Sequence, residues 1–286
     1  MITSVIQAGF GNQLFQYAFA YSIARRLSSQ LILDISFFDY FKKSNPYNLR
    51  EYNLDKLSIE YKSIINSPGR YWKYKLASRY NYAVLKNILG HKNLIIEDID
   101  KCREYQPSVI SAVNQESVLY GFWQNTGYFN EYISDLRRMF RPSYIVSEEV
   151  KKTIENIDKC VSVGVHIRRG DFLNLGWSKG EDYYMNAINA IRSKLPAPRF
   201  YIVSDDTAWC RKTFNTMSDI VVLEMSGQYK DIDEFFILSK CRHQIISEST
   251  FGWWAAYLND TDNKLIAIPS DAVGEIFSSL PNTLKL

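Results

Sequence analysis

Two adjacent arginines at the end of an apolar run are the residues of this sequence best placed to do chemistry. The run covers residues 161–167, and Arg168, Arg169, Gly170 and Asp171 follow it directly. An arginine stays charged at physiological pH, and its planar fork can hold two phosphate oxygens at once. The chemistry these residues suggest is therefore electrostatic stabilisation of a departing diphosphate. The alternative is a surface ion pair between Arg169 and Asp171, but two arginines behind a buried strand favour a functional role.

A glycine turn near the start of the chain is a second candidate site. Gly9 and Gly11 precede Asn12 and Gln13, and apolar residues then recur at helical spacing. Glycines let a ligand approach the backbone closely, and the first turn of a helix offers free N–H groups to an anion. Such turns are often purely structural, but the polar pair here favours a phosphate or sugar ligand.

Two carboxylates and two hydroxyls follow later apolar runs in the same way. Asp205 and Asp206 come after residues 200–203. Asp206 is predicted to cap the next helix, while Asp205 either caps or accepts hydrogen bonds from a ribose or a base. Ser249 and Thr250 stand at the start of another predicted helix, where a hydroxyl can cap the helix or donate to a phosphate.

The spacing of apolar residues predicts the elements that must position these side chains. Strands are expected at residues 161–167, 200–203, 220–223, 244–247 and 265–268, and helices at 184–195, 234–241 and 250–258. This alternation predicts a parallel, doubly wound sheet, in which ligands bind beyond the carboxyl ends of the strands. Residues 1–35 begin in the same way, whereas the segment 39–141 is expected to form helices and long loops. We expect one α/β domain over residues 1–150 and a second over residues 151–286.

Composition and charge narrow the class of protein. The chain has 286 residues, enough for two domains, and its formal net charge of +3 is too small for a general nucleic-acid binder. The four cysteines lie far apart without metal-ligand spacing, which predicts reduced thiols in a cytoplasmic protein. No apolar run reaches about 18 residues, so no transmembrane helix is expected.

Residues 61–96 contain no Asp or Glu and mix basic with aromatic side chains. The members of this mixture are Lys62, Arg70, Tyr71, Trp72, Lys73, Tyr74, Lys75, Arg79, Tyr80, Tyr82, Lys86 and Lys92. Such side chains suit an anionic bilayer surface, which predicts peripheral contact with the inner face of a membrane. A solvated face around an ordinary aromatic core is the alternative.

Five segments in sequence order resemble the bacterial α-1,2-fucosyltransferases. They are GFGNQLFQYAFA, YGFWQNTGYF, VGVHIRRGDF, FYIVSDD and DEFFILSKCRHQIISESTFGWWAAYL, and they lie between residues 9 and 258. The resemblance implies an α/β fold of GT-B type, with two Rossmann-like domains facing across a cleft. It implies inverting transfer of L-fucose from GDP-β-L-fucose to the 2-hydroxyl of a terminal β-galactoside, without a metal or cofactor. The first domain would serve the acceptor, for which a lipid-linked O-antigen glycan is a candidate, and the second would serve the donor.

The resemblance also implies a role for individual residues. Arg168 would hold the β-phosphate as it leaves, with Asn12 near the transfer point, and Asp171 is the nearest candidate for a general base. Trp123 and Gln124 would line the acceptor side. The residues implied in donor binding are Gly11, His166, Arg168, Arg169, Asp205, Glu234, Ser249 and Thr250.

Two positions depart from the family pattern. Residue 248 is Glu where Asn is usual, and residue 252 is Gly where Ser is usual. A carboxylate beside phosphates would repel them unless it points away or is paired with a cation.

Three alternative functions remain open at this stage. Asp231 and Asp233 have the Asp-x-Asp spacing of a metal-dependent transferase, although their place before a helix is typical of helix-start acids. A non-catalytic nucleotide or glycan binder would explain the many aromatic residues, but not the two cations. A transferase that uses another GDP-sugar or another acceptor would be consistent with every motif described above.

Overall fold

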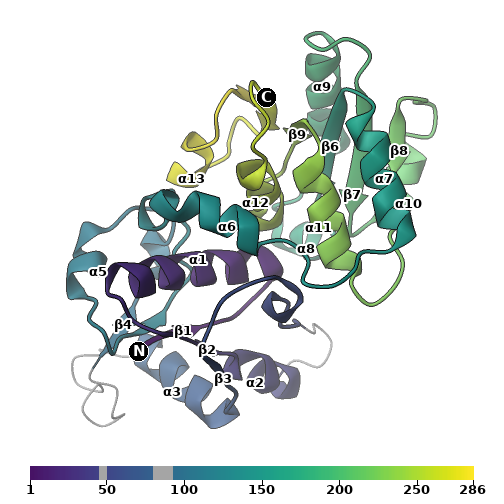
Figure 1. Ribbon diagram of the computed structural model, residues 1–286. Coiled ribbons are helices and arrows are strands. Elements are labelled where there is room, and N and C mark those ends of the chain that lie inside the picture. The colour runs from purple at the N-terminus through teal and green to yellow at the C-terminus, as the bar shows by residue number, and fades with distance from the viewer. Residues whose placement is uncertain (45–49, 80–92) are drawn as a thin grey trace. The chain divides into compact units, whose positions relative to one another are not determined.

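The computed structural model describes residues 1–44, 50–79 and 93–286 (Figure 1). The chain divides into two compact units, Met1–Phe140 and Arg141–Leu286, each built on a parallel sheet. The two units divide between residues 140 and 141, whereas the sequence analysis expects the first domain to end at residue 150. Two parallel sheets with helices between their strands confirm the predicted α/β fold.

The first unit contains a five-stranded sheet in the order β3-β2-β1-β5-β4. Its strands are β1 (Ile2–Val5), β2 (Leu31–Asp34), β3 (Ser63–Ile65), β4 (Leu94–Ile96) and β5 (Val118–Tyr120). The prediction of helices and long loops over residues 39–141 is wrong at β3, β4 and β5. Each of these has three residues and lies in a segment rich in Tyr and Trp, where a short apolar run does not stand out from its surroundings as equally short runs do in the second half of the chain.

The helices of this unit pack on both faces of its sheet, with α1 on one face and α2 and α3 on the other (Figure 1). Their bounds are α1 (Phe10–Arg26), α2 (Ser36–Ser44), α3 (Pro68–Arg79), α5 (Pro107–Ala112) and α6 (Ile133–Met139). Short 3₁₀ turns cover Leu54–Lys56, Ile99–Lys101, Thr126–Tyr128 and Asn130–Tyr132. In α1 every residue from Phe10 to Ala24 is buried except Asn12. A helix buried all round has to fit its surroundings closely, so the direction of Asn12 is fixed by the packing of the whole helix.

The second unit contains a six-stranded sheet in the order β11-β10-β9-β6-β7-β8. Its strands are β6 (Ser162–Ile167), β7 (Arg199–Ser204), β8 (Ile220–Val222), β9 (His243–Ile245), β10 (Ile266–Ile268) and β11 (Thr283–Lys285). The five strands predicted in this half are confirmed within two residues at their ends, whereas β11 was not expected. Every residue of β6 is buried, as befits a central strand covered on both faces.

The helices of the second unit are α7 (Glu148–Asp158), α8 (Gly170–Leu175), α9 (Glu181–Arg192), α10 (Thr207–Thr213), α11 (Lys230–Lys240), α12 (Thr250–Leu258) and α13 (Glu275–Ser278). The helix predicted at residues 250–258 has the same bounds as α12. Trp253 and Trp254 on this helix are fully buried and belong to the core. No helix of the described segments is long and apolar enough to cross a membrane.

Candidate active site

The polar segments of the second unit meet at one edge of its sheet. β6 pairs in parallel with β7 on one side and with β9 on the other. Because parallel strands end at the same edge, the loops that begin at Arg168, Asp205 and Ile246 are neighbours there. This is the edge at which α/β sheets bind their ligands.

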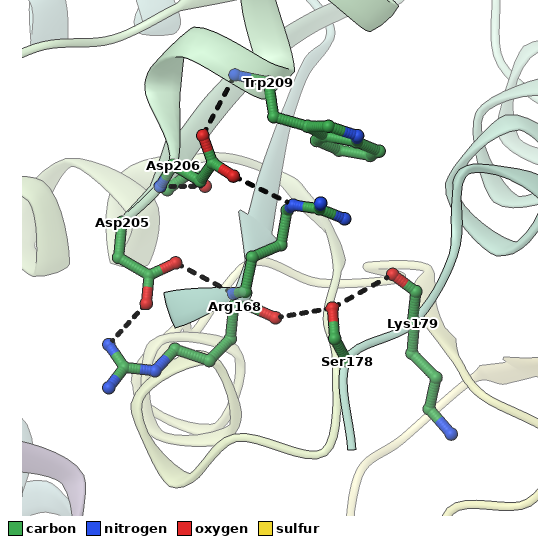
Figure 2. Close-up of polar contacts among 8 residues, drawn as sticks. Arg168, Ser178, Lys179, Asp205, Asp206 and Trp209 are labelled. Atoms are coloured by element: carbon green, nitrogen blue, oxygen red, sulfur yellow. Dashed lines mark hydrogen bonds and ion pairs between the residues drawn. The ribbon is translucent and has the colours of Figure 1, made fainter. Parts of the chain in front are cut away.

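Arg168 lies between two carboxylates at this edge. Its Nη2 is 2.7 Å from Oδ1 of Asp171. Its Nη1 is 3.0 Å from Oδ2 of Asp205 (Figure 2). The side chain is 27% exposed, so the cation is held in place and still reaches the solvent. The ion pair considered between Arg169 and Asp171 is not formed. Asp171 lies in the first turn of α8, three residues beyond Arg168, and it pairs with Arg168 instead.

Arg169 is bound into the protein far more tightly. Its guanidinium lies 4.0 Å from the ring centre of Trp209, and its Nε donates to Oδ2 of Asp206 at 3.1 Å. Its backbone N–H donates to Oδ1 of Asp205 at 2.8 Å. With only 15% of its side chain exposed, Arg169 orders the loop that carries Arg168.

Asp206 caps α10, as the sequence predicts. Its carboxylate accepts a hydrogen bond from the backbone N–H of Trp209 at 3.0 Å (Figure 2). This bond, helped by Arg169, lowers the pKa of Asp206. Asp205 does not cap and is turned toward both arginine residues. The structure thus separates the roles of two neighbouring carboxylates.

His166 is buried beneath this edge. Its ring stacks on Phe251 with centroids 5.0 Å apart, and within the described residues its Nδ1 has no hydrogen-bond partner. Burial, aided by the charge of Arg168, lowers the pKa of His166 to about 3, so the ring is neutral at physiological pH. A side chain at Gly252 would bring its Cβ to 2.8 Å from Nδ1. The glycine found in place of the usual serine therefore leaves room for this ring.

Glu234 is a second buried titratable group of the unit. It lies in α11 and is 5% exposed, and its Oε1 has no hydrogen-bond partner among the described residues. Burial raises its pKa to about 7, although Lys230 lies 3.7 Å away and opposes the shift. A carboxyl of this kind is suited to accept hydrogen bonds from a ligand that excludes water.

Ser249 and Thr250 begin α12 as predicted. Ser249 is the N-cap residue, yet its side chain makes no capping hydrogen bond, so the first backbone N–H groups of the helix are uncapped. The neighbouring Glu248 accepts from the backbone N–H of Val273 and pairs with Lys179, whose Nζ is 3.3 Å from its Oε2. The unusual carboxylate is therefore paired with a lysine, which it shares with Asp271.

The glycine turn of the first unit lies at the carboxyl edge of its own sheet. Gly11 is buried, and Oδ1 of Asn12 accepts a hydrogen bond from Nε2 of Gln124 at 2.9 Å. The contact arises because β5, which precedes Gln124, pairs with β1, which precedes the turn. Trp123 is fully buried against Phe19, with ring centroids 4.6 Å apart, so its ring faces the core and not an acceptor.

The sequence profile described as Glycosyl transferase family 11 matches residues 1–278. The chain belongs to this family. An α-1,2-colitosyltransferase of Escherichia coli is 26% identical to it over 94% of this chain and 91% of its own length. The O-antigen biosynthesis glycosyltransferase WbnK of Escherichia coli is 29% identical over 93% of each chain.

A solved structure supports the fold of this family 11 member. It is that of the α-1,6-fucosyltransferase NodZ soaked with GDP-fucose; NodZ comes from Bradyrhizobium. The TM-score is 0.51 at 15% identity, over 90% of this chain and 91% of that one. With the two parallel sheets, this likeness confirms the predicted GT-B type of fold.

The Asp-x-Asp pair of this family 11 chain does not converge on one point. Asp233 is buried and accepts a hydrogen bond from the hydroxyl of Tyr144 at 2.6 Å, whereas Asp231 is exposed. Both lie in the first turn of α11, where residues two apart point in different directions. Over residues 1–44, 50–79 and 93–286 no cluster of three His, Cys, Asp or Glu could hold a metal ion.

The basic and aromatic stretch is only partly a surface. Tyr71 and Tyr74 are buried, and Arg70 pairs with the buried Asp34 at 2.9 Å, so these residues belong to the core and its edge. Trp72 is 50% exposed. The residues of the stretch that lie outside the described residues are Tyr80, Tyr82, Lys86, Lys92 and the side chain of Arg79.

Sequence reasoning missed Lys179, Asp34 and Glu97. Lys179 precedes α9 and carries no motif, and only the pairing of distant loops brings it to Glu248. Asp34 is the last residue of β2, Glu97 directly follows β4, and both are buried. The polar residue after each apolar run was the one signal that could have indicated them.

The close approach of Gly170 to Asp205 provides a test of the ion pair between Asp205 and Arg168. A Cβ at residue 170 would stand 2.6 Å from Oδ2 of Asp205. Gly170→Ala should therefore displace the carboxylate from Arg168 and lower the free energy of unfolding by about 1–3 kcal/mol, measured by chemical denaturation. Gly69→Ala in the first turn of α3 is the matched control, because no described atom lies within 4 Å of its Cβ. Equal free energies of unfolding for the two variants would contradict this account.

Proposed function

We propose that this protein transfers L-fucose from GDP-β-L-fucose to the 2-hydroxyl of a terminal β-galactoside, with inversion and without a metal. The observation that carries the proposal is the partly exposed cation of Arg168 at the carboxyl end of a central, buried strand. A transferase of this kind needs positive charge where the diphosphate leaves. Family membership and the GDP-fucose soaked into crystals of NodZ support the choice of donor.

In this proposal Arg168 binds the β-phosphate as the glycosidic bond breaks. The arginine exchanges part of its pairing with Asp205 for the phosphate oxygens, and Asp171 continues to orient it. The uncapped N–H groups at Ser249 and Thr250 donate to the phosphates, where the dipole of α12 also favours negative charge.

The guanine base is assigned to the two buried titratable groups. An ionised Glu234 accepts hydrogen bonds from N1–H and the 2-amino group of guanine, while the neutral ring of His166 lies close by. Both groups are shielded from water, which strengthens their hydrogen bonds to a ligand. Selectivity for guanine over adenine follows, because adenine has no donor at N1.

Inversion requires the acceptor hydroxyl to attack from the face of fucose opposite the diphosphate. The sugar passes through a state that resembles an oxocarbenium ion, as in glycoside hydrolysis. Because Asp171 is engaged with Arg168, its proposed role is to position that cation and not to remove a proton. Asn12 of the first unit then serves the transfer point, and Gln124 holds its side chain through a hydrogen bond.

GDP-colitose is a second candidate donor, because one relative is a colitosyltransferase. Colitose is fucose without its 3-hydroxyl, so the two donors differ by a single hydrogen-bonding group. A site that binds this hydroxyl rejects the analogue that lacks it by a large factor. The ratio of kcat/KM for GDP-fucose and GDP-colitose decides between the donors.

The function is tested by incubating the protein with GDP-fucose and lactose in EDTA. We expect an α-1,2-fucosylated trisaccharide and one GDP for each product. Arg168→Ala should lower kcat by about 10²–10³-fold, as does removal of one oxyanion-hole donor, because the departing charge loses its partner.

Arg192→Ala is the matched control for this variant. Arg192 is 30% exposed and pairs with Asp219, but it lies at the end of α9 away from the candidate site. It should leave kcat unchanged. An Arg168→Ala enzyme that keeps more than half of kcat, or a wild type that is inactive with every GDP-sugar, would refute the proposed role.

The raised pKa of Glu234 gives the binding of GDP a predictable pH dependence. Only the ionised carboxylate accepts both guanine hydrogen bonds, so affinity should fall as the pH drops through about 7. Between pH 8 and pH 6 the Kd should rise about tenfold, measured by calorimetry. In Glu234→Gln this rise should shrink to the part that comes from the phosphate of GDP itself. If the Kd for GDP rises equally with falling pH in the wild type and in Glu234→Gln, Glu234 is excluded from the guanine site.

We also propose peripheral contact with an anionic membrane through the exposed part of the basic stretch. The described residues that can provide it are Lys62, Trp72 and Lys73. This contact would suit a lipid-linked glycan acceptor. At low salt the protein should sediment with vesicles containing anionic lipid, and a variant with Trp72→Ala and Lys73→Glu should sediment less. Absence of sedimentation in the wild type would end this proposal.

A further inference from the structure

Asn12 is half-buried, and its side-chain amide is the polar group least covered by protein in an otherwise buried helix segment. From Phe10 to Ala24 the other residues of α1 are all buried. The amide oxygen of Asn12 is occupied, because Nε2 of Gln124 donates to it at 2.9 Å. Its amide nitrogen makes no hydrogen bond with any described residue. What this side chain offers to a ligand therefore depends on which of its two ends faces Gln124.

An arginine determines the orientation of the amide of Gln124. Nε of Arg103 donates to Oε1 of Gln124 at 3.3 Å. A guanidinium can only donate, so the atom of Gln124 that faces it has to be the oxygen. The other end of Gln124, its NH₂ group, must then face Asn12 and requires the oxygen of Asn12 in return. Because Arg103 can only donate hydrogen bonds, it determines the orientation of the Gln124 amide and thereby that of the Asn12 amide.

The backbone that carries Gln124 is held in place by a buried carboxylate. Glu97 accepts hydrogen bonds from the backbone N–H groups of Phe122 and Trp123, the latter at 2.9 Å. A side chain at Gly121 would collide with Glu97, so the loop lies directly on it. Trp123 adopts a φ of 56°, which is unusual for a bulky residue and is maintained by burial of its ring. The backbone N–H of Gln124 donates to the carbonyl of Cys102 at 2.9 Å, which completes the support.

We propose that Arg103 and Gln124 are positioning residues that orient the amide of Asn12 so that its NH₂ group, and not its oxygen, faces the substrates. Asn12 then donates a hydrogen bond to a substrate oxygen, either on the donor or on the acceptor. This inference rests on the proposed function, because it assigns a partner to a residue of the same site. An NH₂ group oriented beforehand stabilises developing negative charge without having to turn during the reaction.

The test reverses the direction of the hydrogen bond between residues 124 and 12 without changing the shape of either side chain. Gln124→Glu keeps an oxygen toward Arg103 and also places an oxygen toward Asn12, whose NH₂ group must then turn inward. Asn12→Asp removes the NH₂ group outright. Both variants should lower kcat about 100-fold, as expected when one donor to a developing charge is lost. Arg103→Lys retains a donor and should keep kcat within about threefold of the wild type.

Gln115→Glu is the matched control for the change of an amide to an acid. Nε2 of Gln115 donates to the carbonyl of Leu27 at an exposed position, so the same chemical change there should leave kcat unaltered. Whichever KM rises in Gln124→Glu, that for GDP-fucose or that for lactose, identifies the substrate whose oxygen Asn12 contacts. A folded Gln124→Glu enzyme with more than half of the wild-type kcat would overturn the proposal.

A second readout does not depend on activity. In ¹⁵N-labelled protein the side-chain NH₂ signals of Asn12 are the pair that disappears in Asn12→Asp. They should exchange quickly with water in the wild type and slowly in Gln124→Glu, where they bond to residue 124. Unchanged exchange would refute the orientation even if the protein failed to transfer fucose, whereas inactivity with altered exchange would refute only the proposed function.

Discussion

The pairing of Arg168 with Asp171 and Asp205 is the interaction on which the arrangement of the second unit depends. Arg168 is held at the end of a fully buried strand, where a cation without partners would be costly. Two carboxylates neutralise it and fix its direction, while about a quarter of its surface stays open. The same two carboxylates connect the start of α8 with the end of β7. The charge that serves the proposed chemistry therefore also organises the loops around it.

The two neighbouring arginines show that adjacency in sequence does not imply a shared role. Arg168 faces the open edge, whereas Arg169 is held against Trp209 and Asp206 and is half as exposed. An arginine stacked on an aromatic ring and paired with a helix cap would lose both contacts if it turned to a ligand. Arg169 is thus suited to hold the loop, and Arg168 to bind an anion.

The two departures from the family pattern have partners elsewhere in the fold. Glu248 is balanced by Lys179, which Asp271 also binds. Gly252 leaves space for the ring of His166, whose burial keeps it neutral. Each unusual residue is compensated by a side chain far away in sequence, so its effect could not be judged from position alone.

The sequence alone determined the α/β class, five of the six strands of the second unit, its helices α9, α11 and α12, and the location of its polar residues at strand ends. Periodicity sufficed there because the strands and helices are long or strongly apolar, as in β6 and α12. It failed over residues 39–141, where the short strands β3, β4 and β5 lie among many aromatic residues and their apolar runs do not stand out. Only the tertiary structure decided that Arg168 pairs with Asp171, that Trp123 is core, and that Gln124 lies between Arg103 and Asn12. Such contacts depend on which strands lie side by side and on how the loops beyond them pack, and a pattern of residue types along the chain does not contain that information.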